Sequence, residues 1–312
     1  MLKRIFAALL AAVLILAFGG CAATKPESTA PRLRIVCTAF PQYDFLRALT
    51  AGAQGVKLSM LLKPGQESHD YDPSSQDILA IHGADMFVYG GGESDSWIEG
   101  VLSTVDTADK TVAAMMDMVQ PLVEELHDGE THEGHNHEYD EHVWTSPKNA
   151  RVIAARLCDL LCERDAAQAE LYRANGAAYA EKLTALDDAF TALVAGAARR
   201  TIVVADRFPI LYFCKAYGLS YHAAFSGCAA SVEPSSQSVQ ALIDAVKSEQ
   251  IAVIFKMELS AGQVAQTVAD NTGCRVETFY ACHNVSADDF AAGVTYLSLM
   301  QENYTVLKEA LS

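Results

Sequence analysis

The densest group of metal-competent side chains in this chain is the segment His127–His142, HDGETHEGHNHEYDEH. Five of the nine histidines and six acidic residues lie within its sixteen positions. Such a segment buries too little apolar area to offset its ordering entropy, so it is predicted to be a loop outside any core. Because neutral imidazole and carboxylate are ligands of borderline divalent cations, the loop is predicted to collect metal. A solvated loop without a role is the alternative.

Further metal-competent side chains follow predicted strands. They lie in four segments, 63–74, 140–147, 205–209 and 282–286. In open α/β sheets, ligands bind outside the carboxyl ends of the strands. Two sheets whose strand ends face each other would bring all four segments to one cleft.

The elements that must position these segments alternate between short β-branched runs and helical stretches. This order predicts an α/β fold with two lobes, each a parallel sheet of the (β/α)4 type covered by helices. The N-terminal lobe is expected over residues 33–163 and the C-terminal lobe over 198–312. The predicted strands are Leu33–Cys37, Val56–Leu62, Met86–Tyr89 and Thr111–Ala114, then Thr201–Ala205, Ser220–Phe225, Ile251–Met257 and Arg275–Phe279.

Residues 164–197 connect the two predicted lobes and contain no proline. Their apolar positions follow helical spacing from Tyr172 to Leu193. A continuous helix of this length would span roughly 50 Å, which suits a rigid strut along both lobes. Two shorter helices broken at Gly176 are the alternative.

The N-terminus has the pattern of an export signal. Lys3 and Arg4 precede the apolar run Ile5–Phe18, which is too short for a comfortable membrane span. Gly19-Gly20-Cys21 resembles the bacterial lipobox, so residues 1–20 are predicted to be a signal peptide and Cys21 to be lipidated. Residues 21–32 would then form the lipidated cysteine and a tether. The chain is expected to be exported and lipid-anchored on the outer face of the bacterial cytoplasmic membrane; an ordinary secretory signal is the alternative.

Charge and cysteine usage narrow the class. A formal net charge of -16 argues against a nucleic-acid partner and suits attraction of cations. Eight cysteines are present, and none forms a CxxC pair. An exported chain permits a disulfide, and Cys228 with Cys282 is the candidate pair, with free thiols as the alternative.

Several motifs together resemble one family. They are Pro64-Gly65 with His69-Asp70-Tyr71 and Pro73-Ser74, His142-Val143-Trp144 with Pro147 and Asn149-Ala150, Tyr212 to Gly218-Leu219, and Gly293 to Asn303. In this order the chain resembles the metal-binding lipoproteins of ABC importers, the zinc and manganese class of solute-binding proteins. The resemblance covers essentially the whole chain after the signal. It implies two lobes joined by one long rigid helix, with the metal site in the cleft between them.

The resemblance also implies a set of metal ligands. His69 and His142 fall on the family's first two histidine ligands. At the third position, five residues before Tyr212, the family has His or Glu, whereas this chain has Arg207. A guanidinium stays protonated and cannot ligate, so Asp206 is the nearest competent donor.

The family's fourth ligand is a carboxylate after the last strand, and here Cys282-His283-Asn284 stands in its place. His283 is therefore the expected donor. An acidic His-rich loop is typical of the zinc members, which implies an auxiliary, weakly binding role for His127, His132, His135 and His137.

Three imidazoles and one carboxylate suit four-coordinate Zn²⁺. Mn²⁺ prefers more oxygen ligands and is the less expected cargo. The expected function is capture of Zn²⁺ and delivery to an ABC permease by a monomer held to the membrane by its lipid anchor, with no enzymatic step. The alternatives are a manganese- or iron-binding member of the same family and an exported zinc hydrolase. The hydrolase is disfavoured because His132-Glu133-Gly134-His135 is one residue short of HExxH.

Overall fold

The structure is a computed structural model that describes residues 31–67, 71–125, 139–227 and 235–312. Residues Arg32–Ser312 form one compact unit, which is described by itself below. Several predicted features lie outside the described residues. These are the signal peptide, Cys21, His69, His127, His132, His135, His137 and Cys228.

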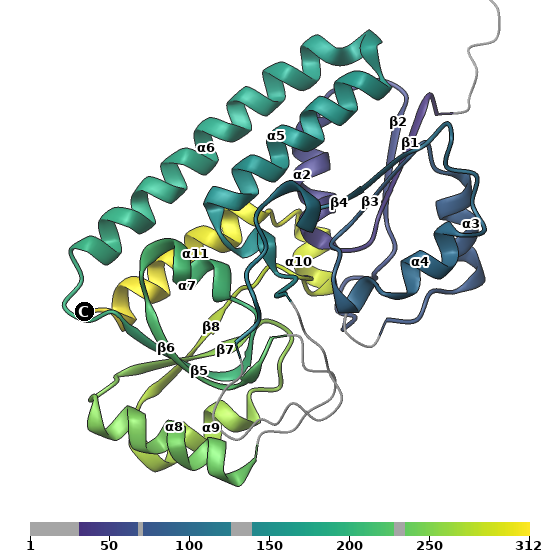
Figure 1. Ribbon diagram of the computed structural model, residues 1–312. Coiled ribbons are helices and arrows are strands. Elements are labelled where there is room, and N and C mark those ends of the chain that lie inside the picture. The colour runs from purple at the N-terminus through teal and green to yellow at the C-terminus, as the bar shows by residue number, and fades with distance from the viewer. Residues whose placement is uncertain (1–30, 68–70, 126–138, 228–234) are drawn as a thin grey trace, which may run out of the picture. The chain divides into compact units, whose positions relative to one another are not determined.

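Two four-stranded sheets form the framework, and all their strands are parallel (Figure 1). The first has the order β2-β1-β3-β4 and the second the order β6-β5-β7-β8, which confirms the predicted α/β fold. The first sheet comprises β1 (Leu33–Cys37), β2 (Val56–Met60), β3 (Met86–Tyr89) and β4 (Thr111–Ala114). The second comprises β5 (Thr201–Phe208), β6 (Ser220–Ser226), β7 (Val253–Met257) and β8 (Arg275–Phe279).

One strand boundary changes the expected site. β5 was predicted to end at Ala205, but it continues to Phe208. Its pairing with β6 shifts register between Val204 and Arg207, which lets the strand continue past an irregularity. Asp206 and Arg207 therefore belong to the end of β5 and not to a loop after it.

Helices cover both sheets, and three apolar clusters hold them there. Val36 and Phe87 of the first sheet pack against α3 and α4, and Val203 and Ile254 of the second pack against α8 and α9. The largest cluster includes residues from both sheets together with the remaining long helices. The helices are α2 (Phe40–Leu49), α3 (Ser75–Gly83), α4 (Trp97–Leu102), α5 (Pro147–Arg164), α6 (Ala169–Ala195), α7 (Leu211–Tyr217), α8 (Ser236–Ser248), α9 (Gln263–Thr272), α10 (Ala287–Ala292) and α11 (Tyr296–Ala310).

The connecting helix is α6, which has 27 residues and contacts α2, α5, α7 and α11. It begins at Ala169, later than the predicted Arg164, because α5 continues to Arg164 and Asp165 caps its end. The helix is continuous through Gly176, so a break at this glycine is excluded. A Cβ at Gly176 would lie 3.0 Å from the Cys158 Sγ atom, so the glycine allows α5 and α6 to approach closely.

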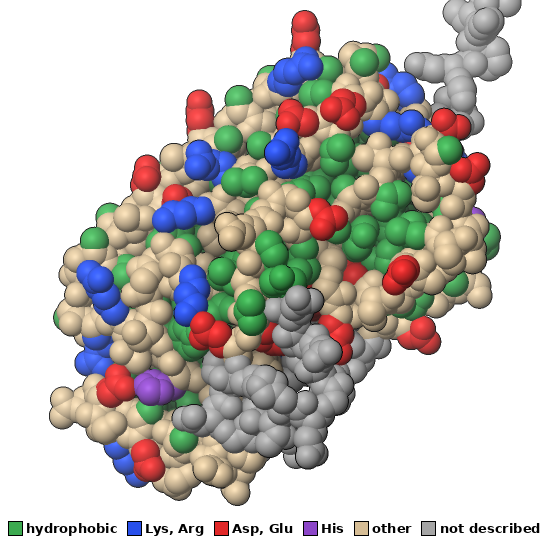
Figure 2. All heavy atoms as spheres, viewed as in Figure 1, with side chains coloured by type: hydrophobic (Ala, Val, Ile, Leu, Met, Phe, Trp, Pro, Cys, Tyr) green, Lys and Arg blue, Asp and Glu red, His purple; other side chains and the backbone are tan. Residues whose placement is uncertain are grey.

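Charged side chains are spread over the surface. On the face drawn in Figure 2, Lys and Arg side chains are interspersed with Asp and Glu side chains. The excess negative charge is therefore not gathered in a single patch on that face. Within the described ranges, no helix has both the length and the apolar composition needed to cross a membrane.

Candidate metal centre

A cavity of about 210 Å³ lies where loops and strand ends from both sheets meet. Its lining includes His142, Asp206 and His283, which are three of the four predicted ligands. His69, the fourth, is outside the described residues, although its chain neighbours Gln66 and Glu67 line the cavity. The structure thus brings residues more than 140 positions apart to one polar cavity.

His142 is fully buried, at 0% exposure, and is oriented by a carboxylate. Its Nδ1 atom lies 3.1 Å from Oδ1 of Asp140, which also accepts the backbone N–H of His142 at 2.7 Å. A proton held on Nδ1 by this carboxylate would leave the Nε2 lone pair able to bind a metal ion. Burial alone would lower the pKa of His142, but Asp140, Glu141 and Glu124 together raise it above its ordinary value.

His283 approaches His142 closely from the loop after β8. The two ring centroids are 5.3 Å apart with an interplanar angle of 85°. Two imidazoles bound to one tetrahedral ion at about 2.0–2.1 Å would have centroids roughly 5 Å apart. Burial, helped by His142 and Arg207, lowers the pKa of His283 well below its ordinary value. The ring is therefore in its neutral, metal-binding form at neutral pH.

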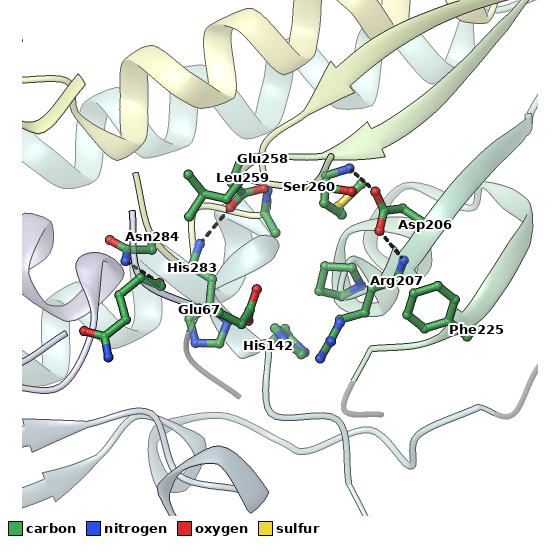
Figure 3. A pocket seen from close by; sticks show the side chains of 14 residues that line it. Glu67, His142, Asp206, Arg207, Phe225, Glu258, Leu259, Ser260, His283 and Asn284 are labelled. Carbon is green, nitrogen blue, oxygen red and sulfur yellow. Dashed lines mark hydrogen bonds between the residues drawn. The ribbon is translucent and has the colours of Figure 1, made fainter. Parts of the chain in front are cut away.

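The backbone around His283 is fixed by Glu258, which follows β7. Its carboxylate accepts the N–H of Ala281 at 2.7 Å and the N–H of His283 at 3.1 Å (Figure 3). Burial raises the pKa of Glu258 to about 7. Trp144 Nε1 donates to the carbonyl of Ala281 at 2.9 Å, which ties this loop to the His142 segment.

Asp206 reaches the same cavity with a different set of contacts. Oδ1 accepts the backbone N–H of Arg207 at 2.9 Å, and Oδ2 accepts that of Met257 at 3.2 Å. Figure 3 shows the Asp206 carboxylate turned toward β7, whereas the Arg207 guanidinium extends toward His142. In the part of the chain that the structure describes, no three His, Cys, Asp or Glu side chains lie close enough to hold one metal ion. Asp206 therefore borders the cavity without joining the pair of imidazoles.

Sequence reasoning did not single out one carboxylate that lines the cavity. Glu67 projects between His142 and His283 in Figure 3. The available signal was its position in the loop after β2, two residues before the predicted ligand His69. Sequence reasoning also gave Glu258 no role, because its contacts to the 281–283 backbone depend on the fold.

Cys282 is the described member of the predicted Cys228–Cys282 pair. Within the described residues its thiol is free, has 0% exposure and belongs to the large apolar cluster. Burial raises the pKa of its thiol well above the ordinary value. Its sequence position beside a site loop was the ground for the predicted pairing, and its side chain belongs to the core. Cys228 itself lies outside the described residues.

A two-sheet α/β fold with histidines in a cavity between the sheets is typical of metal-binding members of the solute-binding proteins. The chain belongs to the family described as zinc-uptake complex component A, periplasmic, which it matches over residues 35–310. The expected resemblance is thereby confirmed.

Relatives of known name agree with this assignment. The chain is 32% identical over 282 residues to zinc-binding lipoprotein AdcA of Streptococcus pneumoniae serotype 4, covering 89% of this chain but only 56% of AdcA. It therefore spans about half the length of that relative. It is 28% identical over 308 residues to the high-affinity zinc uptake system protein ZnuA of Bacillus subtilis, covering 96% and 95% of the two chains. The crystal structure of the Zn(II)-bound ZnuA-like domain of S. pneumoniae AdcA matches with a TM-score of 0.74 and 28% identity, over 89% of this chain and 98% of that domain.

Proposed function

We propose that the chain is an extracytoplasmic solute-binding protein that captures one Zn²⁺ ion in this cavity and delivers it to an ABC permease. The supporting observation is the pair of imidazoles, His142 and His283, whose separation of 5.3 Å fits a shared tetrahedral ion. The named relatives support zinc over manganese, because they are zinc-binding and zinc-uptake proteins.

The proposed ligands are His69, His142 and His283, with Asp206 as the carboxylate. The backbone bonds of Asp206 use one lone pair on each oxygen, so each oxygen retains the capacity to bind a metal ion. Glu67 is the rival carboxylate, because its side chain projects between the two described imidazoles. The two assignments differ in which substitution, Asp206→Asn or Glu67→Gln, weakens zinc binding.

The remaining parts of the proposal concern the chain outside the described residues. Cys21 would carry the lipid anchor that holds a monomer to the outer face of the cytoplasmic membrane. His127, His132, His135 and His137 would raise the local zinc concentration by weak, transient binding. The permease would weaken the ligand set to release the ion, and no covalent step is involved.

A competition titration tests the zinc site. Purified protein is freed of metal with a chelator, and zinc affinity is measured against a competing indicator. One tightly bound Zn²⁺ is expected in the parent, and His142→Ala and His283→Ala should each weaken it by at least about 100-fold. His222→Ala is the matched control, because this exposed imidazole contacts Glu249, away from the cavity. A parent without tight zinc, or two site variants with parental affinity, would contradict the proposal.

A further inference from the structure

A fixed positive charge faces the cavity that is proposed to hold a cation. Arg207 extends from β5 into the cavity, toward His142, with its guanidinium carbon 6.0 Å from the centroid of the Phe225 ring (Figure 3). His283 lines the same cavity. A bare divalent ion between these histidines would be repelled by the same charge.

No acceptor among the described residues neutralises this guanidinium. Its Nη1 atom is buried and has no hydrogen-bond partner there. Within the described residues, the cavity carboxylates of Asp206 and Glu258 bond backbone amides and not this guanidinium: Asp206 accepts from Arg207 N and Met257 N, and Glu258 accepts from Ala281 N and His283 N. Burying an arginine donor without an acceptor is costly, so this geometry indicates an acceptor supplied from outside the described chain.

The cavity has room for such an acceptor. A Zn²⁺ ion with direct protein ligands needs little space of its own, whereas the cavity measures about 210 Å³. A water molecule occupies about 30 Å³ of liquid, so several heavy atoms fit beside the ion. The planar guanidinium fork matches a carboxylate, which can bond it and coordinate a metal with its other lone pairs.

We infer that the cavity takes up Zn²⁺ together with a small carboxylate, which coordinates the ion and is bound by Arg207. This inference rests on the proposed zinc site and adds an anion subsite to it. The carboxylate places a negative charge between two positive ones, so each component raises the affinity for the other. Arg207 is thus a specificity residue for the form in which the metal arrives.

Zinc affinity in matched salts tests the subsite. The parent is titrated with Zn²⁺ at fixed pH and ionic strength in sodium chloride, sodium acetate and sodium sulfate, with free Zn²⁺ corrected for binding by each salt. Acetate should raise the affinity of the parent by about tenfold, which corresponds to one good charge-assisted contact. Sulfate should match chloride, and an equal gain in sulfate would overturn the assignment to a carboxylate.

Variants show whether Arg207 carries the effect. Arg207→Gln should lose the acetate dependence and bind zinc in chloride at least as tightly as the parent, because the repulsion is gone. A merely structural arginine would instead give weaker binding in every salt. Arg151→Gln removes the same charge from an exposed position on α5 and should keep the acetate dependence. Arg207→Lys keeps the positive charge but lacks the planar fork, so it should lose most of the acetate dependence. This variant tests the inference if Arg207→Gln does not fold.

The two proposals fail in different ways. A parent without tight zinc in any salt would remove the zinc site itself. Tight zinc whose affinity is equal in chloride and acetate, or an Arg207→Gln variant that retains the acetate effect, would overturn the anion subsite alone. Zinc-edge X-ray absorption provides a direct reading, because the parent should gain an oxygen neighbour in acetate and Arg207→Gln should not.

Discussion

The imidazole of His142 depends on a single carboxylate for its orientation. Asp140 contacts Nδ1 at 3.1 Å and accepts the His142 amide at 2.7 Å. We expect Asp140→Asn to weaken zinc binding by about 10- to 100-fold, the usual effect of losing a carboxylate that orients a ligating histidine. The competition titration measures this, and unchanged thermal unfolding of the metal-free variant shows that the fold survives. An affinity within twofold of the parent would mean that Asp140 does not set the tautomer.

The two imidazoles should become protonated at different pH values. The pKa of His142 is raised and that of His283 is lowered, so His142 takes up the first proton as pH falls. Because a protonated ring cannot ligate, zinc affinity should begin to fall as pH drops through the pKa of His142, above its ordinary value of about 6.5. In Asp140→Asn the loss of zinc affinity should begin at lower pH, because the negative charge that raises the pKa of His142 is removed. Affinity measured from pH 8 to pH 5 checks this, and a flat profile would contradict a histidine-dominated site.

Residue identity predicted part of this site, and the backbone determined the rest. His142 and His283 could be expected at the cavity from the family resemblance, and because each lies in a segment after a strand, one from each sheet. The directions of Asp206 and Arg207 could not, because alternation along β5 is interrupted by the register shift between Val204 and Arg207. No sequence signal reports that shift.

Among the elements, the turn after β3 shows why three glycines stand together. Gly90 and Gly91 donate their amides to Asp95 at 2.7 and 3.0 Å, and burial, with help from Glu141, raises the pKa of Asp95 to about 7. Gly92 has φ +84°, and a Cβ there would lie 2.5 Å from Glu141 Cβ and Oε2. The three glycines therefore allow the turn after β3 to pack against Glu141, the residue before His142.

Gly92→Ala should therefore be strongly destabilising. Positive φ and a clash with the buried Glu141 together should cost about 2–4 kcal/mol of unfolding free energy. Gly100→Ala is the control, because this exposed helical glycine has nothing within 4 Å of its added Cβ and should be neutral or stabilised by up to about 1 kcal/mol. Urea unfolding of both variants compares them. Equal stabilities would show that the Gly92 turn relaxes without cost.

Element order was predictable because β-branched runs and helical spacing are local properties of the sequence. The start of α6 was not, because α5 continues to Arg164 and only a short turn separates the two helices. Gly176 was ambiguous for a similar reason. Its meaning depends on the Cys158 thiol across the helix pair, which sequence spacing does not place.

Across the whole described unit, the two sheets share one apolar cluster and are also linked at the cavity. Asn284 Nδ2 donates to the carbonyls of Lys63 and Gln66 at 2.8 Å each, and Gly65 N donates to the carbonyl of Val285 at 2.7 Å. Opening the cavity by separating the sheets would break these bonds and expose core. We therefore expect zinc to enter and leave through local loop changes and not through a hinge.

This view predicts almost no change in molecular size on zinc binding. Small-angle X-ray scattering should give radii of gyration for the metal-free and zinc-loaded protein that agree within about 1 Å, because no hinge closure is available. Hydrogen exchange should slow only in the cavity loops, such as 63–67, 140–144 and 281–285. Asn284→Ala removes the link between the loops after β2 and β8, so it should speed exchange there in the metal-free protein and weaken zinc binding. A contraction of several ångströms in the parent would instead mean that the shared core reorganises, and the sheets would then have to move as separate bodies.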